Sequence, residues 1–135
     1  MNVDSIFAAS RFGLEFERLR LEAASHNIAI ANTPGSSGRP ARLMRAVAPY
    51  SPGFDAAIGD HARPELVAAD AAQRQVHDPS DPAADRNGMV SYARVDLVEE
   101  MSTLVDAGRA YEANVRAFNT LRSMALHSLD IGSGS

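Results

Sequence analysis

The sequence predicts a mainly α protein, with long N- and C-terminal helices paired as an antiparallel-type coiled coil or helical bundle and a small irregular, partly β middle region. All seven prolines lie between Pro34 and Pro82, and proline interrupts helices. Apolar residues near the C-terminus follow a heptad spacing, which is typical of paired helices. A length of 135 residues suits one domain. We divide the chain into an N-terminal helical arm (1–33), a middle region (34–91) and a C-terminal arm with a flexible tail (92–135).

The first arm is predicted to begin near Asp4 or Ser5, either of which could cap the helix before the first apolar residues. It is predicted to stop at Thr33-Pro34-Gly35, because the residue before proline is pushed away from helical dihedral angles. Between these points, a seam of apolar residues recurs every seven positions, at Leu14, Leu21 and Ile28.

The second arm carries a longer signal, with two series of seven-residue spacing offset by four. One series is Leu97, Leu104, Tyr111, Phe118 and Ala125; the other is Met101, Gly108, Val115, Arg122 and Leu129. Glycine weakens a helix interior by about 1 kcal/mol, so we expect Gly108 to permit close backbone approach. The arm is predicted to stop at Gly132.

Two asparagines on the arms, Asn27 and Asn114, could be buried polar groups that set the register of the pair, as single polar residues do in coiled coils. They could equally be ordinary exposed residues. In the middle region, residues 41–47 and 66–76 are candidate extended segments, and Asn87-Gly88 predicts a hairpin-type turn leading into residues 89–92.

The composition argues against several classes of function. A formal net charge of -4 does not fit a nucleic-acid partner, and no apolar stretch approaches the roughly 18 to 20 residues of a membrane span. The chain has no cysteine and no recognisable catalytic motif. The acidic residues 78–85 lack the spacing of a calcium loop, and Glu99-Glu100 suit the start of a helix. The sequence therefore predicts no catalytic residue, no cofactor and no metal site, and a protein that is not an enzyme.

Two segments of the arms resemble a known family. Residues 19–33, LRLEAASHNIAIANT, resemble the N-terminal signature of flagellar rod and hook proteins, although Ile30 stands where that family has a second asparagine. In the second arm, VDLVEEMSTLV (95–105) and RAYEANV (109–115) closely resemble the pattern of the proximal rod family FlgC. The run DPAADRNGMV (81–90) fits the same family.

The resemblance implies a structural subunit of the flagellar basal-body rod, which polymerises through its terminal helices as part of the axial drive shaft. It implies contacts with other rod proteins, basal-body ring or adaptor proteins and copies of itself. It also implies export by the flagellar type III apparatus to the periplasm without a cleaved signal peptide. For pairing and assembly, the sequence indicates Leu14, Leu21, Asn27, Ile28, Leu97, Met101, Leu104, Gly108, Tyr111, Asn114, Val115 and Phe118. A rod-like coiled-coil adaptor and a metal-binding helical module outside the flagellum are the alternatives.

Overall fold

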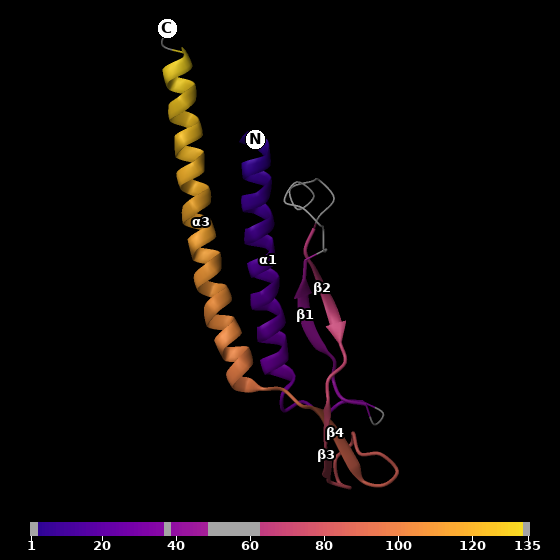
Figure 1. Ribbon diagram of the computed structural model, residues 1–135. Helices are drawn as coiled ribbons and strands as arrows, with labels where there is room; N and C mark the ends of the chain where they lie inside the picture. The colour runs from indigo at the N-terminus through magenta and orange to yellow at the C-terminus, as the bar shows by residue number, and fades with distance from the viewer. Residues whose placement is uncertain (1–2, 37–38, 49–62, 134–135) are drawn as a thin grey trace.

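The computed structural model describes residues 3–36, 39–48 and 63–133. In chain order, the elements are α1 (Val3–Ile30), β1 (Leu43–Val47), β2 (Glu65–Ala69), β3 (Gln73–His77), β4 (Met89–Ala93) and α3 (Leu97–Ser133). Two long helices lie side by side, and the short strands lie beside and below one end of the pair (Figure 1). The predicted fold class, mainly α with a partly β middle region, is confirmed.

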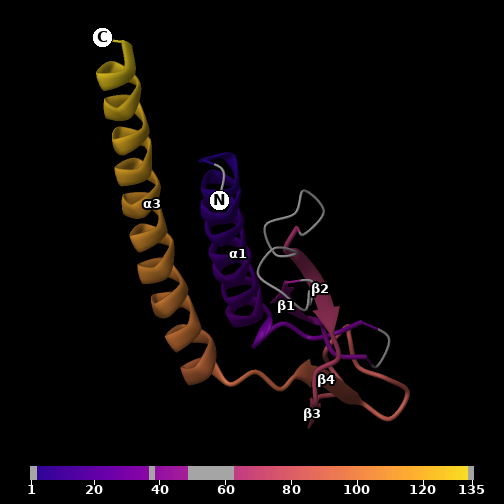
Figure 2. The same cartoon turned by 45° about the horizontal axis from the view of Figure 1, so that its top comes forward.

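The two helices run antiparallel, because the N-terminus of α1 and the C-terminus of α3 lie toward the same end of the molecule in both views (Figures 1 and 2). Helix α1 has 28 residues and α3 has 37. At a rise of about 1.5 Å per residue, α3 is about 55 Å long. The C-terminal end of α3 extends well past the start of α1 (Figure 1).

Helix α1 ends where the sequence predicted. After Ile30 the backbone N–H of Thr33 donates to the Ile30 carbonyl, and the Thr33 hydroxyl donates to Ala29. Pro34, which cannot continue the helix, instead forms a β-bridge with Tyr92. The start differs slightly from the prediction: the helix begins at Val3, so Asp4 lies inside its first turn, where a carboxylate opposes the positive end of the helix dipole.

Helix α3 is capped by Asp96, whose Oδ1 accepts hydrogen bonds from the backbone N–H groups of Val98 and Glu99. Glu99 and Glu100 follow in the first turn. At the other end, the predicted stop at Gly132 is not observed, because the helix continues through this glycine to Ser133. The predicted flexible tail at 134–135 lies outside the described residues.

The four strands form two separate two-stranded antiparallel sheets, β1 with β2 and β3 with β4. The single extended segment predicted at 66–76 is therefore two strands, which belong to different sheets. Residues 70–72 separate them. The predicted turn is present: Gly88, with φ of 72°, directly precedes β4.

Gly88 and Gly132 should respond in opposite directions to alanine. A Cβ on Gly88 would lie 2.9 Å from Pro79 Cγ at a left-handed backbone angle, so we expect Gly88→Ala to destabilise the β3–β4 hairpin by about 1–2 kcal/mol. A Cβ on Gly132 meets no atom within 4 Å, and Gly132→Ala should stabilise α3 by up to about 1 kcal/mol. Hydrogen exchange of the β4 and α3 amides measures both; equal protection of the hairpin in wild type and Gly88→Ala would contradict the first.

The core of the described chain is narrow and built largely from alanine. Ala24 and Ala107 are fully buried between the elements, and Leu19, Ala23 and Ala31 are nearly so. Small side chains let helix backbones approach closely, which explains why a chain with few aromatic residues can still pack two long helices. Val90 and Ala93 of β4 form the buried part of the second sheet.

Candidate functional site in the helix pair

The contacts between α1 and α3 define one antiparallel register along the whole of α1. The rings of Phe7 and Phe118 meet edge to face, with centroids 5.5 Å apart. Further along, Gly13 faces Asn114, whose Nδ2 lies 3.1 Å from the Cβ position of that glycine. Near the base of the pair, Leu21 faces Gly108. These contacts move down α1 as they move back along α3, as an antiparallel pair requires.

Most of the residues that the sequence indicated for pairing are half-buried in this structure. On α1 they are Leu14, Leu21 and Ile28, with Asn27 buried; on α3 they are Leu104, Gly108, Tyr111, Asn114, Val115 and Phe118. Two others lie outside the contact: the Leu97 side chain is 38% exposed and that of Met101 is 52% exposed. The part that each residue plays in assembly stays a prediction.

The seam on α3 is centred about one residue away from one of the two predicted series. Leu104, Tyr111 and Phe118 face α1 as expected, but their companions are Glu100, Ala107, Asn114 and Leu121. The predicted series began at Met101 and continued to Arg122 and Leu129, all three of which are exposed. Ala107 is fully buried. The small side chain of Ala107 allows the backbones to approach, and this determines which face of α3 turns inward.

Asn27 joins three elements through one side chain that is only 3% exposed. Its Nδ2 donates to the backbone carbonyl of Met44 at 3.0 Å and to Glu100 Oε1 at 2.9 Å, while its Oδ1 accepts from the Met44 N–H at 2.8 Å. Helix α1, strand β1 and helix α3 therefore meet at one amide, and we call Asn27, Met44 and Glu100 the polar clamp. The neighbouring His26 adds a second attachment, with Nε2 3.1 Å from the carbonyl oxygen of Arg42.

The clamp explains how the β1–β2 sheet is held against the helices. A strand with an unpaired edge exposes N–H and C=O groups that must find partners. The Asn27 amide supplies a donor and an acceptor to the same residue of β1, as a neighbouring strand would. Sequence reasoning identified Asn27 but missed Met44, which contributes only backbone atoms and so leaves no signal in the sequence. Glu100 was interpreted only as a favourable residue for a helix start.

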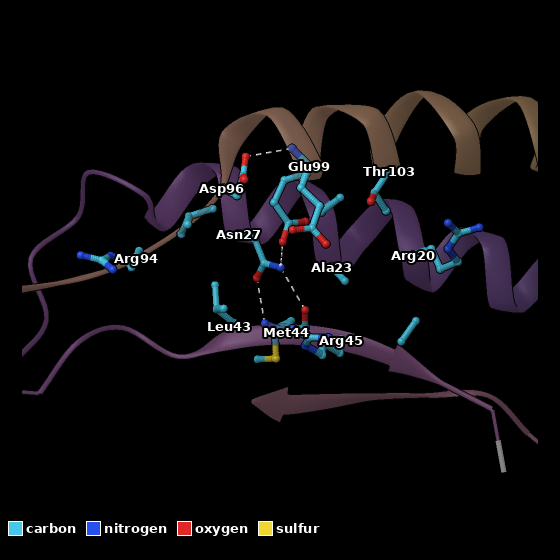
Figure 3. Close-up of a pocket in the computed structure, with 14 residues that line it drawn as sticks. Arg20, Ala23, Asn27, Leu43, Met44, Arg45, Arg94, Asp96, Glu99 and Thr103 are labelled. Carbon is cyan, nitrogen blue, oxygen red and sulfur yellow. Dashed lines mark hydrogen bonds between the residues drawn. The ribbon is translucent and has the colours of Figure 1, made fainter. Parts of the chain in front are cut away.

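A groove of about 470 Å³ lies beside the clamp, between α1, β1 and the start of α3 (Figure 3). Its floor includes Ala23 and Ala24, and its rim carries charges of both signs from Arg20, Arg45, Arg94, Asp96 and Glu99. Arg20 pairs with Glu17 at 2.8 Å, and Asp96 caps α3. The charged groups of known partner therefore serve the structure of the base of the pair.

The acidic turn at 78–88 uses its carboxylates to close its own backbone. Asp81 Oδ1 accepts from the Ala83 N–H, and Asp85 Oδ1 accepts from the N–H groups of Asn87 and Met89. Hydrogen bonds from the hydroxyl and N–H of Ser80 hold the pKa of Asp78 below its usual value. Among the residues described, no group of three His, Cys, Asp or Glu side chains is placed to hold a metal ion.

No helix in the described ranges is both long enough and apolar enough to span a membrane. The surface of the helix pair is instead a mixture of exposed ion pairs, such as Arg18 with Glu22 and Arg116 with Glu112, and exposed apolar side chains on α3. Exposed apolar groups on a long helix are typical of a surface that another protein covers.

Comparison with known proteins gives consistent matches. The family model described as flagellar basal body rod FlgEFG protein C-terminal matches residues 86–131, which span β4 and most of α3. The flagellar basal-body rod protein FlgC of Escherichia coli O6:H1 is 33% identical over 129 residues, covering 95% of this chain and 96% of the relative. The FlgC protein of Salmonella typhimurium is similar to the same extent. That of Borreliella burgdorferi is 32% identical, covering 99% of this chain and all of the relative.

These relatives match both helices and the strands between them, at an identity that carries the relationship over the full length. The chain belongs to the FlgC family of flagellar basal-body rod proteins.

Proposed function

We propose that this protein is a structural subunit of the proximal part of the flagellar basal-body rod. The observation that carries the proposal is the full-length similarity to FlgC proteins from three bacterial genera, which includes both terminal helices. The chain would act as a mechanical part of the axial drive shaft for motility and not as an enzyme.

The geometry of the helix pair supports this role. A rod subunit must be elongated and must keep its shape while it transmits torque. Here α1 and α3 form a long antiparallel pair, and the polar clamp ties the β1–β2 sheet to its base at a defined angle. An amide with three hydrogen bonds in a buried position resists sliding of the three elements, because any shift would leave buried polar groups without partners.

The proposed partners are other rod proteins, the basal-body ring or adaptor proteins and copies of the chain itself. The proposed location is the periplasmic part of the basal body, reached through the flagellar type III export apparatus with the N-terminus uncleaved. Residues of the seam and the exposed apolar side chains of α3 are the proposed assembly surfaces.

Isolation of basal bodies tests the proposal. A strain that lacks the gene should be non-motile, and an epitope-tagged copy should restore motility and co-purify with the hook–basal body. Intact-mass analysis of the recovered chain should show the uncleaved N-terminus. A motile deletion strain, together with tagged protein that is absent from basal bodies, would instead favour a coiled-coil adaptor outside the flagellum.

A further inference from the structure

Two apolar patches lie at opposite ends of α3, and both are open to solvent in the described chain. The base patch consists of Val98, Met101 and Val105, which follow one side of the helix at spacings of three and four. The tail patch consists of Met124, Leu126, Leu129 and Ile131. Their exposure is high at both ends, reaching 76% for Val98 and 80% for Ile131. Burial of such side chains would be favourable by about 1.5–3 kcal/mol each.

The tail patch is exposed because α1 is too short to cover it. The last ring contact between the helices joins Phe7 to Phe118, close to the start of α1 at Val3. Beyond it, Leu121 and Ala125 are still half-buried, and residues 126–132 are fully exposed. The projecting end is visible in yellow in Figure 1. The seam thus continues along α3 into a segment that has no partner helix within the subunit.

The tail is apolar on more than one side, which distinguishes it from a solvated helix end. At about 100° per residue, Leu126 and Leu129 lie on one side of the helix, while Met124 and Ile131 lie on the other. A helix with apolar residues all round is normally buried. A covering partner is therefore needed on at least two sides.

The charges along α3 favour contact between the base of one copy and the tail of another. Residues 96–108 contain four acids, Asp96, Glu99, Glu100 and Asp106, and no basic residue. Residues 113–129 contain Arg116 and Arg122 and no acid. Base against base would bring like charges together, and so would tail against tail. Base against tail brings opposite charges together beside the two apolar patches, which favours that pairing over the other two.

We propose that the tail patch of one copy docks on the base patch of a second copy of this chain. The two patches differ, so the contact is heterologous, and each copy retains one free patch after it has bound. Repetition of such a contact builds an open series of subunits instead of a closed dimer. This contact rests on the proposed rod function for its setting, and it specifies which surfaces join copies of the subunit.

Two double variants of the full chain test the contact. Val98→Glu with Met101→Glu blocks the base and leaves the tail intact, and Leu129→Glu with Ile131→Glu does the reverse. All four side chains are exposed, so both variants should keep the helical circular dichroism of the wild type. The matched control is Ala113→Glu with Ala117→Glu, which adds the same charge at exposed positions of α3 between the two patches.

Sedimentation velocity over a range of concentrations gives the readout. We expect the wild type and the control to form a concentration-dependent series of oligomers, and each blocked variant alone to lose every species larger than the monomer. An equimolar mixture of the two blocked variants should form a 1:1 dimer and nothing larger, because only one intact base and one intact tail remain per pair.

Three results would overturn the proposal: a monomeric wild type at submillimolar concentration, a dimer formed by either blocked variant alone, or oligomers that both variants leave unchanged. None of these would affect recovery of the chain in purified basal bodies. Failure of the self-contact is therefore distinguishable from failure of the proposed rod function.

Discussion

Replacement of Asn27 by leucine is expected to lower the free energy of unfolding by about 2–4 kcal/mol, the largest loss among single changes at the base of the helix pair. Leucine has nearly the same volume but can neither donate nor accept. The N–H and carbonyl of Met44 would lose their partners in a buried position, and Glu100 would lose a donor. Urea unfolding followed by far-UV circular dichroism measures the change.

Two further variants separate hydrogen bonding from packing at this position. Asn119→Leu, the same change at an exposed asparagine of α3, should alter stability by no more than about 0.5 kcal/mol. Asn27→Asp keeps the shape but replaces both Nδ2 hydrogen bonds with contacts between a carboxylate and two acceptors, so it should be at least as destabilising as leucine. An Asn27→Leu variant as stable as Asn119→Leu would show that the clamp contributes nothing to stability.

Leu104→Asp should destabilise the α1–α3 pair by about 2–4 kcal/mol, because it places a carboxylate in the seam without a compensating partner. Leu104 is half-buried in that seam, at the position where the heptad series of the sequence and the observed contact agree. We expect loss of helical content on mild heating, followed by circular dichroism, and loss of assembly in cells.

The adjacent Val105→Asp provides the control, since that side chain is 52% exposed. It should leave the unfolding free energy of the monomer nearly unchanged and weaken only self-association through the base patch. A Leu104→Asp protein that is fully folded, as stable as Val105→Asp and still able to assemble would refute the pairing of the helices through this seam.

Local features of this fold were predictable because they depend on neighbouring residues. Thr33-Pro34 ends α1 through restrictions on two adjacent residues, and the hairpin turn at Gly88 follows from one residue with positive φ. The strands were harder to place. Residues 66–76 do not alternate cleanly, and their division between two sheets depends on partners at 43–47 and 89–93.

The candidate site was only partly predictable. Asn27 was expected either to be buried or to be an ordinary exposed residue, and the sequence alone could not choose between these. The choice depends on Met44, which lies 17 positions away and takes part through its backbone. On α3, two neighbouring seven-residue series are compatible with the sequence, because Gly108 and Ala107 are both small. The packing of Leu21 and Gly13 of α1 against α3 selects between them.

The sequence by itself determined that there are two long helices, where the first one ends, and that the chain belongs to the FlgC family. These properties are recorded in local periodicity, helix breakers and contiguous motifs. Only the tertiary structure decided which face of α3 meets α1, what Asn27 binds, and how far α3 projects beyond its partner. Each of these depends on contacts between segments far apart in the chain, where one buried hydrogen bond or one small side chain outweighs the weak preferences of the local sequence.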